Sequence, residues 1–307
     1  MSILSRPEFH NEEAAYAYVE ARVWANGRVC PHCGEAERTS KMGGKSTRIG
    51  TYKCYGCRKP FTVKIGTIFE ASHVPMNLWL QAIYLMCASK KGISSNQLHR
   101  TLGVTLKTAW FMSHRIREAM RDDNLAGFGS GGGVVEVDET FIGREPGMEK
   151  KAGYFHKMKM LTLVDRTTGR AKAIVVDDLK VATLMPIIRE NIAKEATIYT
   201  DEAKQYARIG RAFAHHDFTT HKAGEYVRGD VHTNTVEGYF SIFKRGMKGV
   251  YQHCGKRHLH RYAAEYEFRY NNRIANGPND AARADIALSG VSGKRLTYRR
   301  TSAALQH

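Results

Sequence analysis

Apolar and polar residues alternate along residues 134–143 (VVEVDETFIG), a period that is typical of a half-buried β-strand. Val135 and Val137 fall on one face of this predicted strand, and Glu136 and Asp138 fall on the other. Aspartate is unfavourable in strands, so Asp138 needs an explanation. A strand-end aspartate that faces water is the simplest one, but two later segments favour a functional site.

The segments that follow predict an α/β domain. Strands are predicted at residues 160–166 and 170–176, with a TTG turn between them, and a helix at residues 181–193. A short β-rich run then ends at Asp201, and residues 213–220 are a candidate further strand. Three strands, a helix and a fourth strand follow the ribonuclease-H-like order, with a mixed sheet and flanking helices.

Helical periodicity dominates the first part of the chain. One helix is predicted at residues 11–26, and three more at residues 78–88, 94–102 and 105–120, with Gly103 at the turn before the last. This order indicates a helix-turn-helix region, although a plain helical hairpin would give the same pattern. In the first interpretation the last helix presents side chains to a DNA groove, among them Lys107, Thr108 and Arg115.

Four of the six cysteines form two CxxC pairs, Cys30 with Cys33 and Cys54 with Cys57, separated by 20 residues. This spacing is typical of two zinc knuckles that share one tetrahedral ion. Four thiolates leave no ligand position open to water, so we expect a structural Zn²⁺ in a zinc ribbon. The alternative is a thiol cluster without metal.

Composition changes suggest domain boundaries. Five glycines in residues 127–133 cannot support a helix, so we place a linker there that lets its neighbours move relative to each other. The predicted organisation is an N-terminal helix (1–26), a zinc ribbon (27–70), a helix-turn-helix region (71–126), the linker (127–133), a catalytic domain (134–275) and a basic, flexible or DNA-bound tail (276–307).

The charge of the chain indicates a polyanionic partner. Lys and Arg total 47 against 30 Asp and Glu, a net charge of +17. From residue 238 onward 13 basic residues face 4 acidic ones, with tyrosines between them, a mixture that is typical of nucleic-acid binding. With no apolar leader or membrane-spanning run, and with two CxxC pairs that argue against a disulfide framework, we expect a cytoplasmic protein.

A third acidic residue completes a candidate site. Glu237 lies in the predicted helix of HTNTVEGYFSIFKRG, which Thr233 or Thr235 would cap, and 35 residues separate it from Asp201. Carboxylates from two strands and a helix can converge on hard divalent cations, which prefer oxygen ligands. Two such cations, Mg²⁺ or Mn²⁺, suit phosphoryl transfer.

Together, VEVDETFIG, TDEAKQY, the segment around Glu237 and HLHRYAAEYEFRYNNR make the chain resemble insertion-sequence DDE transposases of the ISXO-like group, from about residue 30 to 273. The resemblance implies that Asp138, Asp201 and Glu237 bind two magnesium ions. It also implies DNA contacts by Lys244, with Arg245 nearby. His232 and Asn234 match the same motif, and some relatives are described with Asn as the third catalytic residue.

The resemblance further implies binding to double-stranded DNA at terminal inverted repeats, strand cleavage, and transfer of the freed 3′-hydroxyl to target DNA. Pairing of two element ends predicts at least a homodimer, in a prokaryotic cytoplasm and associated with the nucleoid. Two alternatives remain: a DNA-binding regulator without catalysis, and a metal-dependent nuclease without strand transfer.

Overall fold

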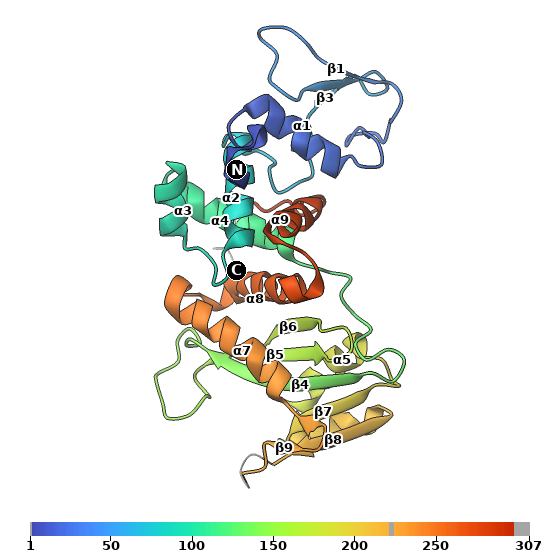
Figure 1. Cartoon of the computed structure of the whole chain (residues 1–307), viewed down its shortest axis with the longest axis vertical. Coiled ribbons are helices and arrows are strands. Elements are labelled where there is room, and N and C mark those ends of the chain that lie inside the picture. The colour runs from blue at the N-terminus through green and yellow to red at the C-terminus, as the bar shows by residue number, and fades with distance from the viewer. Residues whose placement is uncertain (1, 221–223, 298–307) are drawn as a thin grey trace, which may run out of the picture. The chain divides into compact units, whose positions relative to one another are not determined.

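The computed structural model describes residues 2–220 and 224–297, which fall into two compact units (Figure 1). Unit 1 comprises residues 1–88, 95–120 and 280–307, and unit 2 comprises residues 89–94 and 121–279, in each case as far as they are described. No helix among the described residues has the length and apolar character needed to cross a bilayer.

Unit 1 joins a small sheet to a group of helices. Its elements are the 3₁₀ turns Ile3–Ser5 and Pro7–Phe9, the helices α1 (Glu12–Val23), α2 (Met76–Ala88), α3 (Ser95–Leu102), α4 (Leu106–Met120) and α9 (Asp280–Ser289), and the strands β1 (Thr39–Lys41), β2 (Tyr52–Cys54) and β3 (Pro60–Phe61). The four helices predicted from periodicity in this half of the chain are present, with ends that differ by at most three residues.

The turn between α3 and α4 uses the predicted glycine. Gly103 has φ +66°, a conformation that costs a residue with a side chain about 1 kcal/mol or more, and its N–H donates to the His99 carbonyl. The Thr105 hydroxyl then accepts from the Thr108 N–H at 3.1 Å and caps α4. Local interactions, the left-handed turn at Gly103 and the Thr105 cap, therefore determine where α3 ends and α4 begins.

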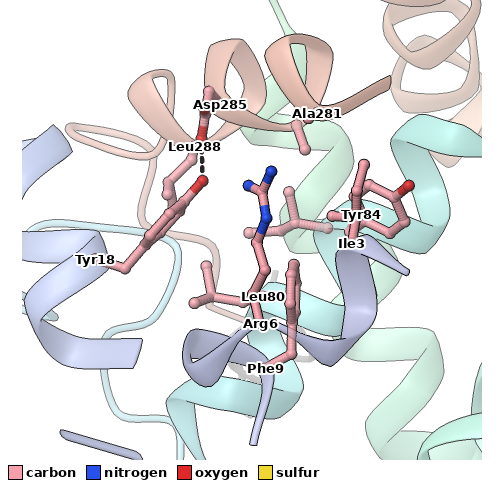
Figure 2. A pocket seen from close by; sticks show the side chains of 11 residues that line it. Ile3, Arg6, Phe9, Tyr18, Leu80, Tyr84, Ala281, Asp285 and Leu288 are labelled. Carbon is pink, nitrogen blue, oxygen red and sulfur yellow. Dashed lines mark hydrogen bonds between the residues drawn. The ribbon is translucent and has the colours of Figure 1, made fainter. Parts of the chain in front are cut away.

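Residues 280–293 correct the prediction of a flexible tail. They form α9 and a following turn, in which Ala287, Leu288 and Val291 are buried. Figure 2 shows Asp285 of α9 accepting a hydrogen bond from Tyr18 of α1, at 2.7 Å. The pocket beside this contact has a volume of about 20 Å³, enough for one water, so it is a packing seam. The basic end of the predicted tail, residues 298–307, lies outside the described residues.

Unit 2 is built on a mixed five-stranded sheet in the order β6-β5-β4-β7-β8. β4 (Val134–Ile142) pairs antiparallel with β5 (Met158–Asp165), which pairs antiparallel with β6 (Ala171–Val176). On its other side β4 runs parallel to β7 (Thr197–Asp201), and β7 parallel to β8 (His215–Thr219). This is the predicted ribonuclease-H-like order, with residues 213–220 containing the further strand.

Helices cover both faces of this sheet. The remaining elements of unit 2 are α5 (Val181–Asn191), α6 (Lys204–Ile209), a 3₁₀ turn (Gly210–Ala212), the hairpin β9 (Val227–Arg228) and β10 (Val231–His232), α7 (Asn234–Gly246), a π-helical turn (Met247–Tyr251), α8 (Lys256–Asn271) and a 3₁₀ turn (Ile274–Asn276). Val135 and Val137 pack with α5 and α6 on one face, while Ile142 and Met160 pack with α7 and α8 on the other. Alternate residues of 134–143 thus pack into two separate hydrophobic cores, one on each face of the sheet.

Polar side chains of α8 cover the free edge of β6. Glu267 accepts from the Ala173 N–H at 3.0 Å, and the Asn271 amide both accepts from Ala171 N–H and donates to its carbonyl. An exposed strand edge invites pairing with other chains, and this helix satisfies it instead. Burial of the carboxyl raises the pKa of Glu267 to about 7.

This pKa predicts a pH-dependent stability. Because the folded chain binds the Glu267 proton more tightly than the unfolded chain, its contribution to the free energy of unfolding is largest below pH 4.5 and declines as pH rises toward 7. Glu267→Gln keeps an acceptor for Ala173 and removes this decline. Urea unfolding at pH 5 and pH 8 should show the variant gaining about 1 to 3 kcal/mol on wild type between the two values. An unchanged difference would contradict the assignment.

The glycine-rich segment is attached to unit 2 rather than free. Phe128 is buried, and its N–H and C=O bond to Asn191 and Ala193. The Gly129 N–H donates to the Asp165 carboxylate at 2.9 Å. The glycines serve tight turns, since Gly129 has φ +71° and a side chain there would collide with Ala196. The expectation of a mobile linker is therefore wrong for residues 128–133.

Candidate functional site

The four paired cysteines converge at one end of the small sheet of unit 1. The sulfur atoms of Cys30 and Cys57 lie 3.7 Å apart and those of Cys33 and Cys54 lie 3.6 Å apart. All four sulfurs lie within 4.8 Å of one another. A tetrahedron of ligands with Zn–S bonds of about 2.3 Å requires sulfur separations of about 3.8 Å, so the thiols fit a structural Zn²⁺.

The two knuckles share a backbone geometry but differ in residue type. The residue after the second cysteine is left-handed in both: Gly34 has φ +79° and Arg58 has φ +62°. The conformation is costly for arginine, which has a side chain. We therefore predict that Arg58→Gly raises the free energy of unfolding by about 0.5 to 1 kcal/mol, measured by urea denaturation with zinc present. Arg58→Ala is the control, because alanine keeps the strain; an equal gain in both variants would contradict this explanation.

Strand register brings two of the predicted acids to one place in unit 2. Val134, Val135 and Glu136 of β4 pair with residues 197–199 of β7 in parallel. The same offset places Asp138 level with Asp201, on the face that α7 and α8 cover. Glu237 lies in the first turn of α7, which crosses this face (Figure 1).

The pKa of Asp138 indicates that the three carboxylates lie in electrostatic range of one another. Burial raises the pKa of Asp138 well above its usual range, and the charges of Glu139, Asp201 and Glu237 raise it further. Burial lowers the pKa of Lys244, against the opposing effect of Asp138 and Glu237. The ammonium group of Lys244, on α7, therefore lies in electrostatic range of Asp138 and Glu237.

The donor set fits hard divalent cations. Among the described residues, the four thiols are the one group of three or more His, Cys, Asp or Glu side chains whose ligand atoms all lie within 4.8 Å of one another. The three carboxylates are therefore in electrostatic range without all coming that close. Anions in a partly buried site repel one another, and cations bound between them would relieve this repulsion. Oxygen donors of this kind suit Mg²⁺ or Mn²⁺.

A buried glutamate that the sequence argument did not single out joins α7 to the sheet. Glu136 is fully buried and accepts from the Val236 N–H at 2.9 Å and from the Thr235 hydroxyl at 2.7 Å. It therefore caps the helix that carries Glu237. The predicted capping by the side chain of Thr233 or Thr235 is wrong: Thr233 occupies the N-cap without a side-chain bond to the helix N–H groups, and Thr235 donates to Glu136.

Arg166, directly after β5, completes this connection. Its Nε donates to Glu136 at 2.5 Å, and its other nitrogens donate to the Asp230 carbonyl and to the Nδ1 and carbonyl of His232. His232 Nδ1 also accepts from the Asn234 N–H, at 3.3 Å. His232 thus orients the start of α7. Asn234 is the first residue of that helix and is exposed.

A second connection holds the strand that ends at Asp201. Glu139 accepts from Gln205 at 2.9 Å and from the Tyr206 hydroxyl, both on α6, which begins three residues after Asp201. Burial is the main reason that the pKa of Glu139 rises to about 7. Sequence reasoning missed Glu136, Glu139 and Arg166. The available signal was the presence of two further acids, Glu136 and Glu139, close to Asp138 in the same strand.

The residues predicted to bind DNA are differently placed. Lys107 is exposed and lines an open groove of about 710 Å³ together with Thr108. Arg115 is a correction: it is buried, and its guanidinium donates to the carbonyls of Ile68 and Glu70 at 2.7 and 2.9 Å, which fixes the loop after the ribbon. Arg245 is exposed and donates to Ser241, one turn earlier on α7.

The chain combines a ribonuclease-H-like sheet that carries clustered carboxylates with a four-thiol ribbon. Comparison with known families identifies the class of protein that has both. The model of the ISXO2-like transposase domain, of the IS1595 DDE group, matches residues 131–271, and that of the transposase zinc-ribbon domain of the same group matches residues 10–60. Together they span well over half of the chain, which therefore belongs to the ISXO2-like transposase family.

Relatives support the same family. The chain is 29% identical over 242 residues to an uncharacterized protein in transposable element ISH50 of Halobacterium salinarum, covering 72% of this chain and 78% of that protein. It is 28% identical over 100 residues to an uncharacterized transposase-like protein of Haemophilus influenzae, covering 32% of this chain and 79% of that protein.

Among solved structures, a chain of the simian T-cell lymphotropic virus intasome in complex with PP2A regulatory subunit B56 gamma matches 55% of this chain and 63% of its own length, less than two thirds. Its sequence identity is 13% and its TM-score is 0.28. A TM-score this low supports no inference about this chain.

Proposed function

We propose that this protein is a transposase that binds the terminal inverted repeats of an insertion sequence and catalyses metal-dependent strand cleavage and strand transfer. The observation that supports the proposal is that the charges of Asp201 and Glu237 act on the pKa of Asp138, with the three acids on two parallel strands and a helix of a domain of the transposase family. Fixed carboxylates that repel one another are suited to binding divalent cations.

The carboxylates position the reacting groups. Asp138 and Asp201 are ligands on adjacent strands, and Glu237 is the third ligand on α7. Bound Mg²⁺ or Mn²⁺ ions, two to a site, would supply charge stabilisation to the attacking and leaving oxygens of an in-line displacement. The chain's own contribution is orientation: Glu136 and Arg166 set the position of α7, and Glu139 with Tyr206 sets that of α6.

Basic side chains hold the DNA phosphates. Lys244, inside the field of Asp138 and Glu237, contacts a phosphate beside the scissile bond, and the exposed Arg245 binds the next part of the backbone. Asn234, exposed at the start of α7, orients substrate. Lys107 and Thr108, at the start of α4, contact the end sequence, while His232 acts through α7 rather than on DNA.

Synapsis of two element ends requires at least two active sites, so we propose a homodimer or larger assembly on double-stranded DNA. A DNA substrate of this kind places the protein with the nucleoid in the cytoplasm. The net charge of +17 supports a polyanionic partner.

The test is an assay of the full chain on linear DNA that carries the element's own ends, with and without Mg²⁺, and with a supercoiled plasmid as target. A transposase produces cleaved ends and joined products. Cleaved ends without joined products would make the protein a nuclease, and binding without cleavage would make it a DNA-binding regulator.

A further inference from the structure

An exposed stack of aromatic rings lies at the far end of the strand that carries Asp138. The ring centroids of Phe141 and Tyr154 are 4.4 Å apart at an interplanar angle of 30°, and those of Tyr154 and Phe155 are 4.9 Å apart at 23°. Phe155 is 71% exposed and Tyr154 is 44% exposed. Neighbouring aromatic side chains seldom stay this accessible to water unless the surface has a partner.

The stack is held in place by its surroundings. Tyr154 and Phe155 belong to the segment between β4 and β5, which projects beside α7 in Figure 1, and Phe141 belongs to the end of β4. The base of this segment is closed by a hydrogen bond from Glu145 N–H to the His156 carbonyl at 2.8 Å. The buried Glu145 carboxylate pairs with Lys256 of α8 at 3.0 Å. The rings are therefore presented on a fixed support, and binding would cost little ordering entropy.

The stack lies further along the strand that carries Asp138. Phe141 is three residues beyond Asp138 on β4, about 10 Å along the strand, so its side chain leaves the sheet on the face opposite to that of Asp138. Pairing between β4 and β7 ends at Glu136, while pairing between β4 and β5 continues to Ile142, so β7 does not cover this end of β4. The charge of Lys157, at the end of the segment between β4 and β5, contributes to lowering the pKa of Lys244.

The charge around the stack selects the occupant. The segment exposes Arg144, Lys150 and Lys151 against one exposed acid, Glu149. This excess of positive charge is expected where a nucleic-acid backbone binds, because its phosphates are anionic. A protein partner without net charge would not require it. Aromatic rings beside basic residues are the usual platform for unpaired bases, which stack regardless of sequence.

We propose that the stack formed by Phe141, Tyr154 and Phe155 binds the unpaired bases of a DNA strand as it leaves the catalytic carboxylates. The proposal rests on the proposed function and adds a substrate form: DNA that is locally single-stranded beside the scissile phosphate. Phe155, the outermost ring, carries the contact with the base, and the neighbouring cations hold the backbone.

The test measures binding of the full chain to a 12-nucleotide oligothymidine containing one 2-aminopurine, and to a blunt duplex of equal length, with Ca²⁺ present in place of Mg²⁺. We expect Phe155→Ala to weaken single-strand binding by about tenfold and to abolish quenching of the 2-aminopurine, with less than a twofold change on the duplex. Phe155→Trp should restore both. Ile274→Ala is the matched control, because Ile274 is 72% exposed and lies outside the stack.

Equal loss on both DNAs, or no loss on either, would overturn the proposal. So would an altered oligomeric mass in Phe155→Ala with unchanged DNA affinity, since the stack would then be a contact between subunits. The two proposals fail separately: wild type that cleaves ends, with a Phe155→Ala variant that binds normally, sinks the stack alone. Wild type that quenches 2-aminopurine but never cleaves sinks the transposase activity alone.

Discussion

Asp138→Ala is expected to lower the rate of end cleavage at least a thousandfold while leaving affinity for end DNA within about threefold. Asp138 is the acid that Asp201, Glu237 and Glu139 all surround, so its removal takes away the central cation ligand. Loss of a carboxylate from this anionic cluster relieves repulsion, so we expect the variant to fold and to be at least as stable as wild type.

The measurement is single-turnover cleavage of labelled end DNA, with binding followed by anisotropy in Ca²⁺. Glu190→Ala is the control, because it removes the same charge from an exposed position on α5. Cleavage by Asp138→Ala within tenfold of wild type would place the chemistry elsewhere. Equal loss of binding and cleavage would point to a folding or DNA-binding defect instead.

Glu136→Ala should lower the free energy of unfolding by about 3 to 5 kcal/mol, the largest stability effect that we predict. Glu136 is fully buried, so the substitution leaves the Arg166 charge without its partner and the Thr235 hydroxyl and Val236 N–H without their acceptor. Cleavage should fall as well, because α7 loses its attachment to β4 and Glu237 its fixed position.

Glu136→Gln separates these effects. Its amide oxygen can still accept from the helix, so we expect a smaller loss of stability, about 1 to 2 kcal/mol, and partial cleavage activity. Urea denaturation of both variants gives the comparison. A loss below 1 kcal/mol in Glu136→Ala would contradict the view that this residue holds α7, and equal losses in the two variants would assign its effect to charge alone.

The sheet could be predicted because its information is local. Alternation in residues 134–143 and the strand ending at Asp201 fix which side chains share a face, and a constant offset then aligns Asp138 with Asp201. The zinc ligands were equally predictable, since thiol chemistry and CxxC spacing leave few alternatives. In both cases residues near in sequence determine the geometry.

Side-chain partners that are distant in sequence could not be predicted. Arg115 lies on the predicted recognition helix, but helical periodicity cannot predict that its guanidinium donates to the carbonyls of residues 68 and 70. Residues 280–293 are rich in alanine and glycine and give a weak helical signal, so only their packing against α1 and α2 shows that they fold. The alternation puts Glu136 on the face of Asp138, but it does not say that α7 covers Glu136 there.

The most direct test of the central claim compares cleavage of end DNA by Glu237→Gln and Asn234→Ala. Glu237 shares the field of Asp138 and Lys244, and Asn234 lies one turn earlier, at the start of α7; both residues are exposed. The three-carboxylate site predicts that Glu237→Gln loses cleavage at least a hundredfold and that Asn234→Ala stays within tenfold of wild type. An active Glu237→Gln beside an inactive Asn234→Ala would contradict it and make Asn234 the third catalytic residue.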